Sequence, residues 1–337
     1  MATIYEVAQA AGVSLATVSR VINDSDKVRA KTREKVLAAM AELDYRPNVF
    51  AQSLASNRTN CIGVLVSELH GPIFGPMLST IENTLKEAGK FAIITAAHSD
   101  AEKEAEGIRF LTERKCDALI LHIEALSSDY FLEHRETLLP YVLLNRQIPS
   151  LEHHCLALDN EEGGYLATKA ILELGHRRIA YISGPSGWGD AEARLAGHRR
   201  ALAEYGVPWN DRLFFEGDFT ENAGSDGTAA ILDAGLPVTA VVCANDEMAV
   251  GAMDQLRSRG FRIPEDISII GFDNVRWARF LYPKLSTIHY PLEDMSRMAA
   301  HWVLKHVYGR ENLEIAHGFA PRLVLRDTTG PVPENSA

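Results

Sequence analysis

The chain of 337 residues lacks the features that mark exported, membrane-bound or disulfide-linked proteins. No apolar stretch approaches the roughly 18 residues that a membrane-spanning helix needs. No basic leader followed by an apolar run stands at its start, so we expect a protein that is not exported. The four cysteines have no paired spacing of the kind found in disulfide frameworks or zinc sites, which favours reduced thiols and a cytoplasmic location. They are Cys61, Cys116, Cys155 and Cys243.

Catalytic and metal-binding motifs are also missing. The stretch GPSGWG would need glycine in place of Trp188 to form the nucleophile elbow of a hydrolase. No Gly-x4-Gly-Lys-Ser/Thr loop for phosphate binding occurs. The twelve histidines have no spacing typical of metal ligands. We therefore expect a protein that is not an enzyme and that carries no cofactor and no metal.

Charge is distributed unevenly along the chain, whose formal net charge is −11. Residues 1–60 hold eight basic and six acidic side chains, a net charge of +2, whereas the remaining residues hold 26 and 39, a net charge of −13. A mildly basic head can approach DNA, while an acidic body repels it. Many acidic enzymes also have a slightly basic end, so this asymmetry favours a nucleic-acid partner only in combination with other evidence.

The first 45 residues have the periodicity of three short helices. Thr3 and Glu6 fit a capping box at the start of the first helix. Gly12 permits a sharp turn, and Ser14 fits the N-cap of the second helix. A third helix is predicted at about 32–45. The apolar side chains expected to face inward are Ile4, Val7, Ala8, Ala11, Val18, Val21, Ile22, Val36, Leu37, Met40 and Leu43.

Two short helices joined by a glycine turn and supported by a third are typical of a helix-turn-helix unit, here with its motif at about 4–23. The second helix would enter the major groove. Arg20 can donate two hydrogen bonds to guanine, while Leu15 and Ala16 can read groove shape and thymine methyl groups. The alternative is a small helical bundle with a solvated Arg20. Phosphate contacts, which position without specifying, are predicted for Ser14, Thr17 and Asn23.

The next segment, YRPNVFAQSLASNRT, contains one short amphipathic stretch. Pro47 ends the preceding helix, and Asn48 can cap a turn that runs through Leu54. A helix this short is unstable alone, so we expect it to order only on a partner. The alternative is a plain interdomain linker.

Six stretches together resemble the signatures of the lactose/galactose-repressor (LacI/GalR) family of transcriptional regulators. They are TIYEVAQAAGVSLATVSRVIN, YRPNVFAQSLA, LGHRRIAYISGP, ARLAGHRRAL, VVCANDEMAVGAM and ISIIGFDN, and they follow that family's order and spacing across nearly the whole chain. VLLNRQIP and DAEARLAG are most similar to the galactose-repressor branch. The resemblance implies that residues 1–60 are a DNA-binding domain with a hinge helix at about 48–56 that folds on DNA. By this resemblance Leu54, flanked by Ala51 and Ala55, wedges into a base step of the minor groove.

From residue 61 onward, short runs rich in Val and Ile alternate with amphipathic helices such as 76–88 and 247–259. This alternation predicts parallel sheets covered on both faces, and the number of strands favours two doubly wound subdomains over one. The strands are predicted at 61–67, 91–97, 118–122, 141–145, 178–184, 240–245 and 267–272. The expected fold is an all-α helix-turn-helix headpiece followed by an α/β core that resembles periplasmic binding proteins.

Ligands of open parallel sheets bind beyond the carboxyl ends of the strands, where this sequence places several polar side chains. Two such edges facing each other would form a polar cleft, in which carboxylates and guanidinium groups can bind sugar hydroxyls. For any single residue, a helix cap or surface ion pair is the alternative. The family resemblance implies effector contacts for Phe74, Arg146, Asp190, Arg194, Phe219, Asn245 and Asp273.

These observations predict a regulator that binds a palindromic operator in double-stranded DNA as a homodimer and represses sugar-utilisation genes. Operator affinity would change when a mono- or disaccharide binds in the cleft. The alternative function is a sugar-binding receptor of the transport type. The effector-binding and dimerisation domain is expected at 61–337. Its subdomains are expected at about 61–160 with 290–320, and at about 161–289 with 321–330.

Overall fold

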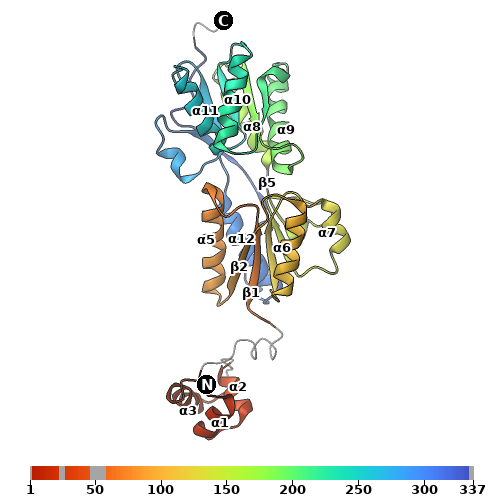
Figure 1. The fold of residues 1–337 in the computed structure, drawn as a ribbon, viewed down its shortest axis with the longest axis vertical. Coiled ribbons are helices and arrows are strands. Elements are labelled where there is room, and N and C mark those ends of the chain that lie inside the picture. Colours follow the sequence, from red (N-terminus) through yellow and green to blue (C-terminus); the bar gives the residue numbers. More distant parts are fainter. Residues whose placement is uncertain (1, 23–26, 46–57, 334–337) are drawn as a thin grey trace. The chain divides into compact units, whose positions relative to one another are not determined.

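A computed structural model describes residues 2–22, 27–45 and 58–333. The chain divides into two compact units, residues 1–60 and 61–337. Figure 1 shows both units. Within the described residues, no helix is both long and apolar enough to span a membrane.

The first unit is a three-helix domain consisting of α1 (Ile4–Ala11), α2 (Leu15–Ile22) and α3 (Ala30–Glu42). The predicted capping box at α1 is present, since the Thr3 hydroxyl accepts from the Glu6 backbone N–H and the Glu6 carboxylate accepts from the Thr3 N–H. Gly12 ends α1 in the left-handed conformation with φ of 64°. The third helix begins and ends two to three residues earlier than predicted, because Tyr45 lies beyond the turn that follows α3.

Side chains from all three helices form the small core of this unit. Its buried members are Val7, Ala8, Val18, Val21, Val36 and Ala39. The prediction that Leu37 is buried is wrong, because this side chain is 50% exposed. The helical face that includes Val36 continues through Ala39 and Met40 instead.

The second unit contains two six-stranded sheets, in agreement with the predicted pair of parallel-sheet subdomains. The first sheet has the order β11-β5-β4-β3-β1-β2, and all of its pairings are parallel. Its strands are β1 (Cys61–Val66), β2 (Phe91–Ala96), β3 (Ala118–His122), β4 (Tyr141–Leu144), β5 (Cys155–Leu158) and β11 (Gly318–Phe319).

The second sheet has the order β12-β10-β9-β8-β6-β7. Its pairings are parallel except for β12, which runs antiparallel to β10. Its strands are β6 (Ile179–Ser183), β7 (Phe214–Glu216), β8 (Ala240–Cys243), β9 (Ser268–Asp273), β10 (Ser286–His289) and β12 (Arg322–Val324).

Helices cover both faces of the first sheet. Successive strand residues point to opposite faces, and here the residues on both faces are apolar. Ile62 and Val64 pack into one apolar cluster with α5 (Gly71–Glu87) and α12 (Leu292–His306), whereas Leu65 packs with α6 (Ala101–Glu113) and α7 (Ser128–His134). The helix predicted to start at Pro76 begins at residue 71, because Pro72 already occupies its first turn.

The second sheet is flanked by two pairs of packed helices (Figure 1). α8 (Asn160–Glu173) packs on α9 (Gly189–Glu204), and α10 (Glu221–Asp233) packs on α11 (Asp246–Ser258). Glycines allow these close approaches: a Cβ on Gly164 would lie 2.1 Å from the carbonyl oxygen of Arg194, and one on Gly197 would lie 1.9 Å from that of Glu161. Single-turn 3-10 helices occupy Glu152–His154, Asp211–Leu213 and Arg276–Arg279.

Three segments pass between the two sheets. The chain crosses from β5 to α8, returns from β10 to α12, which packs on the first sheet, and crosses again from β11 to β12. These crossings hold the two sheets beside each other and place polar residues at their junction. The candidate ligand site is built there.

Candidate DNA-binding helix and effector cleft

In the first unit, α2 separates an apolar inner side from an exposed outer side. Val18 and Val21 are buried, whereas Leu15, Ala16 and Arg20 are exposed, as a helix that reads DNA requires. The Ser14 hydroxyl accepts from the Thr17 backbone N–H at 3.2 Å and lies 2.9 Å from the Thr17 hydroxyl. The predicted phosphate contacts Ser14 and Thr17 therefore also stabilise the start of this helix.

Four of the predicted DNA contacts and the predicted hinge helix at about 48–56 lie outside the described residues. These contacts are Asn23, Ala51, Leu54 and Ala55.

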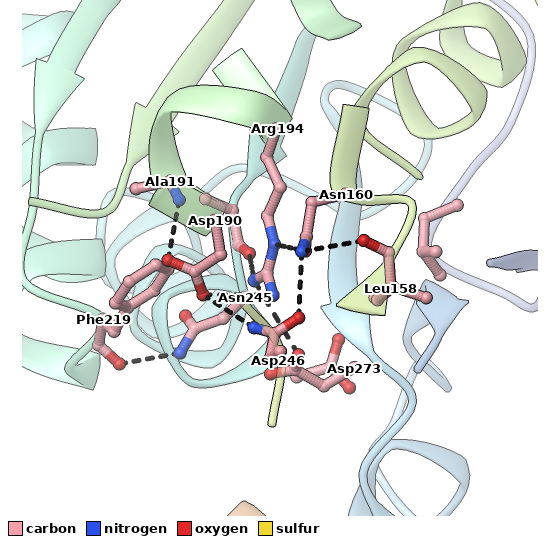
Figure 2. Close-up of polar contacts among 12 residues, drawn as sticks. Leu158, Asn160, Asp190, Ala191, Arg194, Phe219, Asn245, Asp246 and Asp273 are labelled. Carbon is pink, nitrogen blue, oxygen red and sulfur yellow. Dashed lines mark hydrogen bonds and ion pairs between the residues drawn. The ribbon is translucent and has the colours of Figure 1, made fainter. Parts of the chain in front are cut away.

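In the second unit, Arg194 on α9 is the centre of a buried polar cluster (Figure 2). Its side chain is 3% exposed. Nε donates to the Asn160 side-chain oxygen at 2.9 Å, and Nη1 donates to the Ala244 carbonyl at 2.6 Å. These two bonds fix the plane of the guanidinium group by contacts to α8 and to the loop after β8.

Two carboxylates flank this guanidinium group. Nη2 lies 3.5 Å from Asp190 Oδ2, and Nη1 lies 3.8 Å from Asp273 Oδ1. Burial raises the pKa of Asp273 well above its usual range, although the positive charge of Arg194 opposes this effect. The cluster thus offers acceptors and donors side by side, the arrangement that binds a polyhydroxylated ligand.

Aromatic rings lie against the same group. The Arg194 guanidinium carbon is 3.8 Å from the centre of the Phe272 ring and 5.7 Å from that of Phe219. Phe219 has a φ of 69°, and a Cβ on Gly184 would lie 2.1 Å from its ring. Glycine at residue 184 is therefore required for the ring to occupy this position.

Asn245 holds the neighbouring backbone. Its side-chain oxygen accepts from the Met248 N–H at 2.9 Å and so caps α11, while its Nδ2 donates to the Phe219 carbonyl at 2.8 Å. This residue, predicted as an effector contact, thus also positions Phe219.

A chain of amide groups links this cluster to the first sheet. Asn160 Nδ2 donates to the Asn145 side-chain oxygen at 3.0 Å, and Asn145 Nδ2 lies 3.5 Å from Asp190 Oδ2. Asn145 follows β4 with a φ of 56°, and Asp273 ends β9 with a φ of 112°. Unusual backbone angles at both strand ends are a feature of ligand-binding sites.

The structure brings five of the seven predicted effector residues together: Asp190, Arg194, Phe219, Asn245 and Asp273. The other two lie on the first-sheet side. Arg146 follows Asn145 and shares with Asp190 a recess of about 930 Å³. Phe74, on the first turn of α5, packs edge-on against His122, with 5.6 Å between ring centres. Neither has a direct contact with Arg194 among the described residues.

Two further buried groups, His122 and Tyr290, were not predicted. His122 Nδ1 and the Tyr290 hydroxyl have no hydrogen-bond partner among the described residues. Burial lowers the pKa of His122 and raises that of Tyr290 well above its usual range, and both groups sense the charges of Asp190 and Arg194. Each stands at or just after a strand end, where ligands of open parallel sheets bind.

The described part of the chain contains no group of three or more His, Cys, Asp or Glu side chains placed to hold a metal ion.

Comparison with known proteins identifies both units. Bacterial regulatory proteins of the lacI family match residues 3–48, and a periplasmic binding protein-like domain matches residues 168–329. The HTH-type transcriptional regulator GalR of Salmonella typhimurium is 40% identical over 97% of this chain and 95% of its own length.

Solved structures agree with this result. The structure of the lac repressor dimer bound to operator and the anti-inducer ONPF has a TM-score of 0.85 at 31% identity, over 98% of this chain and 99% of that one. The complex of the transcriptional regulator CelR with cellobiose has a TM-score of 0.71 at 31% identity, over 97% of this chain and 100% of that one. The chain therefore belongs to the lacI family of bacterial regulatory proteins, which are DNA-binding transcription regulators with a ligand-binding core.

Proposed function

We propose that this regulator represses sugar-utilisation genes and that a mono- or disaccharide in the cleft changes its affinity for the operator. The buried Arg194 guanidinium, flanked by Asp190 and Asp273 and covered by the Phe219 ring, carries this proposal. Carboxylates accept from sugar hydroxyls, guanidinium groups donate to them, and an aromatic face covers the C–H face of a sugar ring. The related CelR structure contains cellobiose, and another relative of this family contains ribose.

Operator recognition is assigned to residues 1–60. Arg20 would donate to guanine, with Leu15 and Ala16 against base edges and thymine methyl groups. Residues 48–56 would form a hinge helix in the minor groove, with Leu54 between base pairs and Ala51 and Ala55 beside it. Ser14, Thr17 and Asn23 would contact phosphates.

Residues 61–337 are proposed to bind effector and to form a homodimer, so that two helix-turn-helix units read the halves of a palindrome. The sugar would bridge the side chains of the two sheets, with Phe74 and Arg146 on one side and Arg194 with its neighbours on the other. A sugar that favours one orientation of the subdomains would shift the folding equilibrium of the hinge helices. This shift is limited by the sugar's differential affinity, typically ~1–3 kcal/mol. We place this protein in the cytoplasm.

The test is a thermal-shift screen of the full chain against monosaccharides and disaccharides, followed by operator-binding titrations with the sugar that stabilises it most. We expect Arg194→Lys, which keeps the charge but not the planar fork, to bind operator and to lose its response to sugar. Arg20→Ala should keep sugar binding and lose operator preference. A normal sugar response in Arg194→Lys would contradict the effector site, and retained operator preference in Arg20→Ala would contradict the recognition helix.

A further inference from the structure

The loop that follows β3 is held by a buried carboxylate. Glu104 on α6 is fully buried, and its Oε1 accepts from the backbone N–H groups of Glu124 at 3.1 Å and Ala125 at 3.0 Å. Its Oε2 accepts from the Leu126 N–H at 2.7 Å. Three charge-assisted hydrogen bonds to one carboxylate fix the backbone that presents the Glu124 side chain.

Arg146 holds the same loop at Leu126. Its Nη2 donates to the Leu126 carbonyl at 2.5 Å, and its guanidinium carbon lies 5.4 Å from the centre of the Phe131 ring. The loop therefore lies between two charged side chains, and both Glu124 and Arg146 line the recess that also contains Asp190.

Each of these two side chains has one buried atom without a hydrogen-bond partner among the described residues. The atoms are Glu124 Oε1 and Arg146 Nη1, so the two groups do not satisfy each other. They are nevertheless electrostatic neighbours, because burial and Asp190 raise the pKa of Glu124 while Arg146 opposes that rise. A buried acceptor beside a buried donor, both unsatisfied, is the pattern of a ligand contact.

The chemistry of the pair selects an uncharged ligand. A hydroxyl group donates one hydrogen bond and accepts others, so it can donate to Glu124 and accept from Arg146 at once. An ammonium group would leave Arg146 Nη1 without an acceptor. A phosphate would be repelled by the acidic lining of the recess, which consists of Glu124, Glu152, Asp159, Glu161 and Asp190.

We propose that Glu124 and Arg146 form a second carboxylate–guanidinium pair, which binds the hydroxyl groups of an uncharged sugar on the first-sheet side of the cleft, and that Glu104 positions Glu124 for this contact. This inference rests on the proposed function, since it assigns residues and ligand charge to the same cleft.

The test measures affinity by calorimetry for the full chain with ribose, glucose, galactose and cellobiose, and then with the deoxy, amino and phosphate derivatives of the best of these. We expect Glu124→Gln to weaken binding of that sugar roughly 10- to 100-fold, the effect of losing a hydrogen bond to a charged group. Glu152→Gln is the matched control, because it removes the same charge from an exposed position on the same recess. It should change affinity less than twofold.

A deoxy sugar that lacks the contacting hydroxyl should bind the wild-type protein 10- to 100-fold more weakly than the parent sugar does. Glu124→Gln should bind the deoxy sugar and the parent sugar with the same affinity. Amino and phosphate derivatives should bind more weakly than the parent sugar. Three results would overturn this inference and leave the proposed function intact. They are unchanged affinity of Glu124→Gln for the sugar, equal losses of affinity in Glu124→Gln and Glu152→Gln, and tighter binding of a charged derivative than of the parent sugar. Failure of all four sugars to bind the wild-type protein would overturn both.

The positioning role of Glu104 is tested by a double-mutant cycle of affinity. Because Glu104 acts through Glu124, Glu104→Gln should weaken binding in the wild-type background and have no further effect in Glu124→Gln. Additive losses would show that Glu104 acts through some other part of the structure and would contradict the positioning role.

Discussion

The two sides of the cleft differ in how far the protein satisfies its own charged groups. On the second-sheet side, Arg194 bonds to Asn160 and the Ala244 carbonyl and lies beside Asp190 and Asp273. On the first-sheet side, His122, Glu124 and Arg146 each keep a buried atom without a partner among the described residues. The charged groups of the second-sheet side are therefore satisfied by the fold, although the Tyr290 hydroxyl after β10 is not, whereas both charged groups of the first-sheet side have hydrogen bonds left for a ligand.

This difference separates stability from binding. Removing a group from the second-sheet side breaks contacts that exist without ligand, so it should reduce both the free energy of unfolding and sugar affinity. Removing a partly unsatisfied group from the first-sheet side should reduce affinity with a smaller cost to stability.

The largest effect is expected for Arg194→Met, which leaves the buried Asp190 and Asp273 without a cation. Loss of one partner from a buried charged cluster destabilises by about 3–5 kcal/mol. Arg146→Met loses the hydrogen bond to the Leu126 carbonyl and the opposing charge beside Glu124, but Glu124, whose pKa burial raises, can take up a proton, so the cost should be smaller, about 1.5–3 kcal/mol. Urea unfolding of both variants measures the two values, and equal losses would remove the distinction between the two sides.

A smaller loss is expected for Gly164→Ala, because the added Cβ would lie 2.1 Å from the Arg194 carbonyl oxygen and would push α8 away from α9. Overpacking of this kind costs about 1–3 kcal/mol and should also displace the Arg194 side chain and weaken sugar binding. Gly75→Ala on α5 is the control, since its Cβ meets no atom within 4 Å. It should change the free energy of unfolding by less than about 1 kcal/mol, because the gain in helix propensity is opposed by Pro76, which disfavours a helical residue with a Cβ before it. Similar unfolding curves for the two variants would contradict the tight α8–α9 contact.

The smallest effect concerns Glu247, on the first turn of α11. A Cβ on Gly71 of α5 would lie 3.8 Å from its Oε1, so this carboxyl reaches the first-sheet side. Burial, and then Glu221, raise its pKa from 4.5 to about 7. Between these pH values the folded protein binds more protons than the unfolded chain, so this group's contribution to stability falls as pH rises.

Glu247→Gln removes this titration. We expect the Tm of the variant minus that of the wild type to increase between pH 5 and pH 8, measured by differential scanning fluorimetry. Burial lowers the pKa of His198 to about 3, so this histidine makes stability rise with pH. It is present in both proteins, and its effect therefore cancels in the Tm difference. A difference independent of pH would show that Glu247 has an ordinary pKa in the folded protein.

The longer elements of the fold could be predicted from the sequence, because β1, β3 and β9 are continuous apolar runs and α1 has its capping residues. Strands β5, β7, β10, β11 and β12 were missed. They have two to four residues, and STIH of β10 and FFE of β7 contain polar side chains that no periodicity distinguishes from a loop. Their pairing depends on the neighbouring strands rather than on local sequence.

The candidate site residues came from the family resemblance, and two of them, Asn245 and Asp273, also adjoin predicted strand ends. His122, at the end of a predicted strand, was overlooked. Tyr290 could not be found because β10 was not recognised. Asn160 adjoins no strand or helix that was predicted from the sequence. Its contact with Arg194 arises only when α8 and α9 pack together. Such a contact is a property of the tertiary structure.

The most direct test of the central claim is operator affinity of the wild-type chain with and without a saturating sugar whose binding a thermal shift has established. The account predicts a change of about 5- to 150-fold, the range of a coupling free energy of ~1–3 kcal/mol. An operator Kd that stays the same while the cleft is occupied would contradict it.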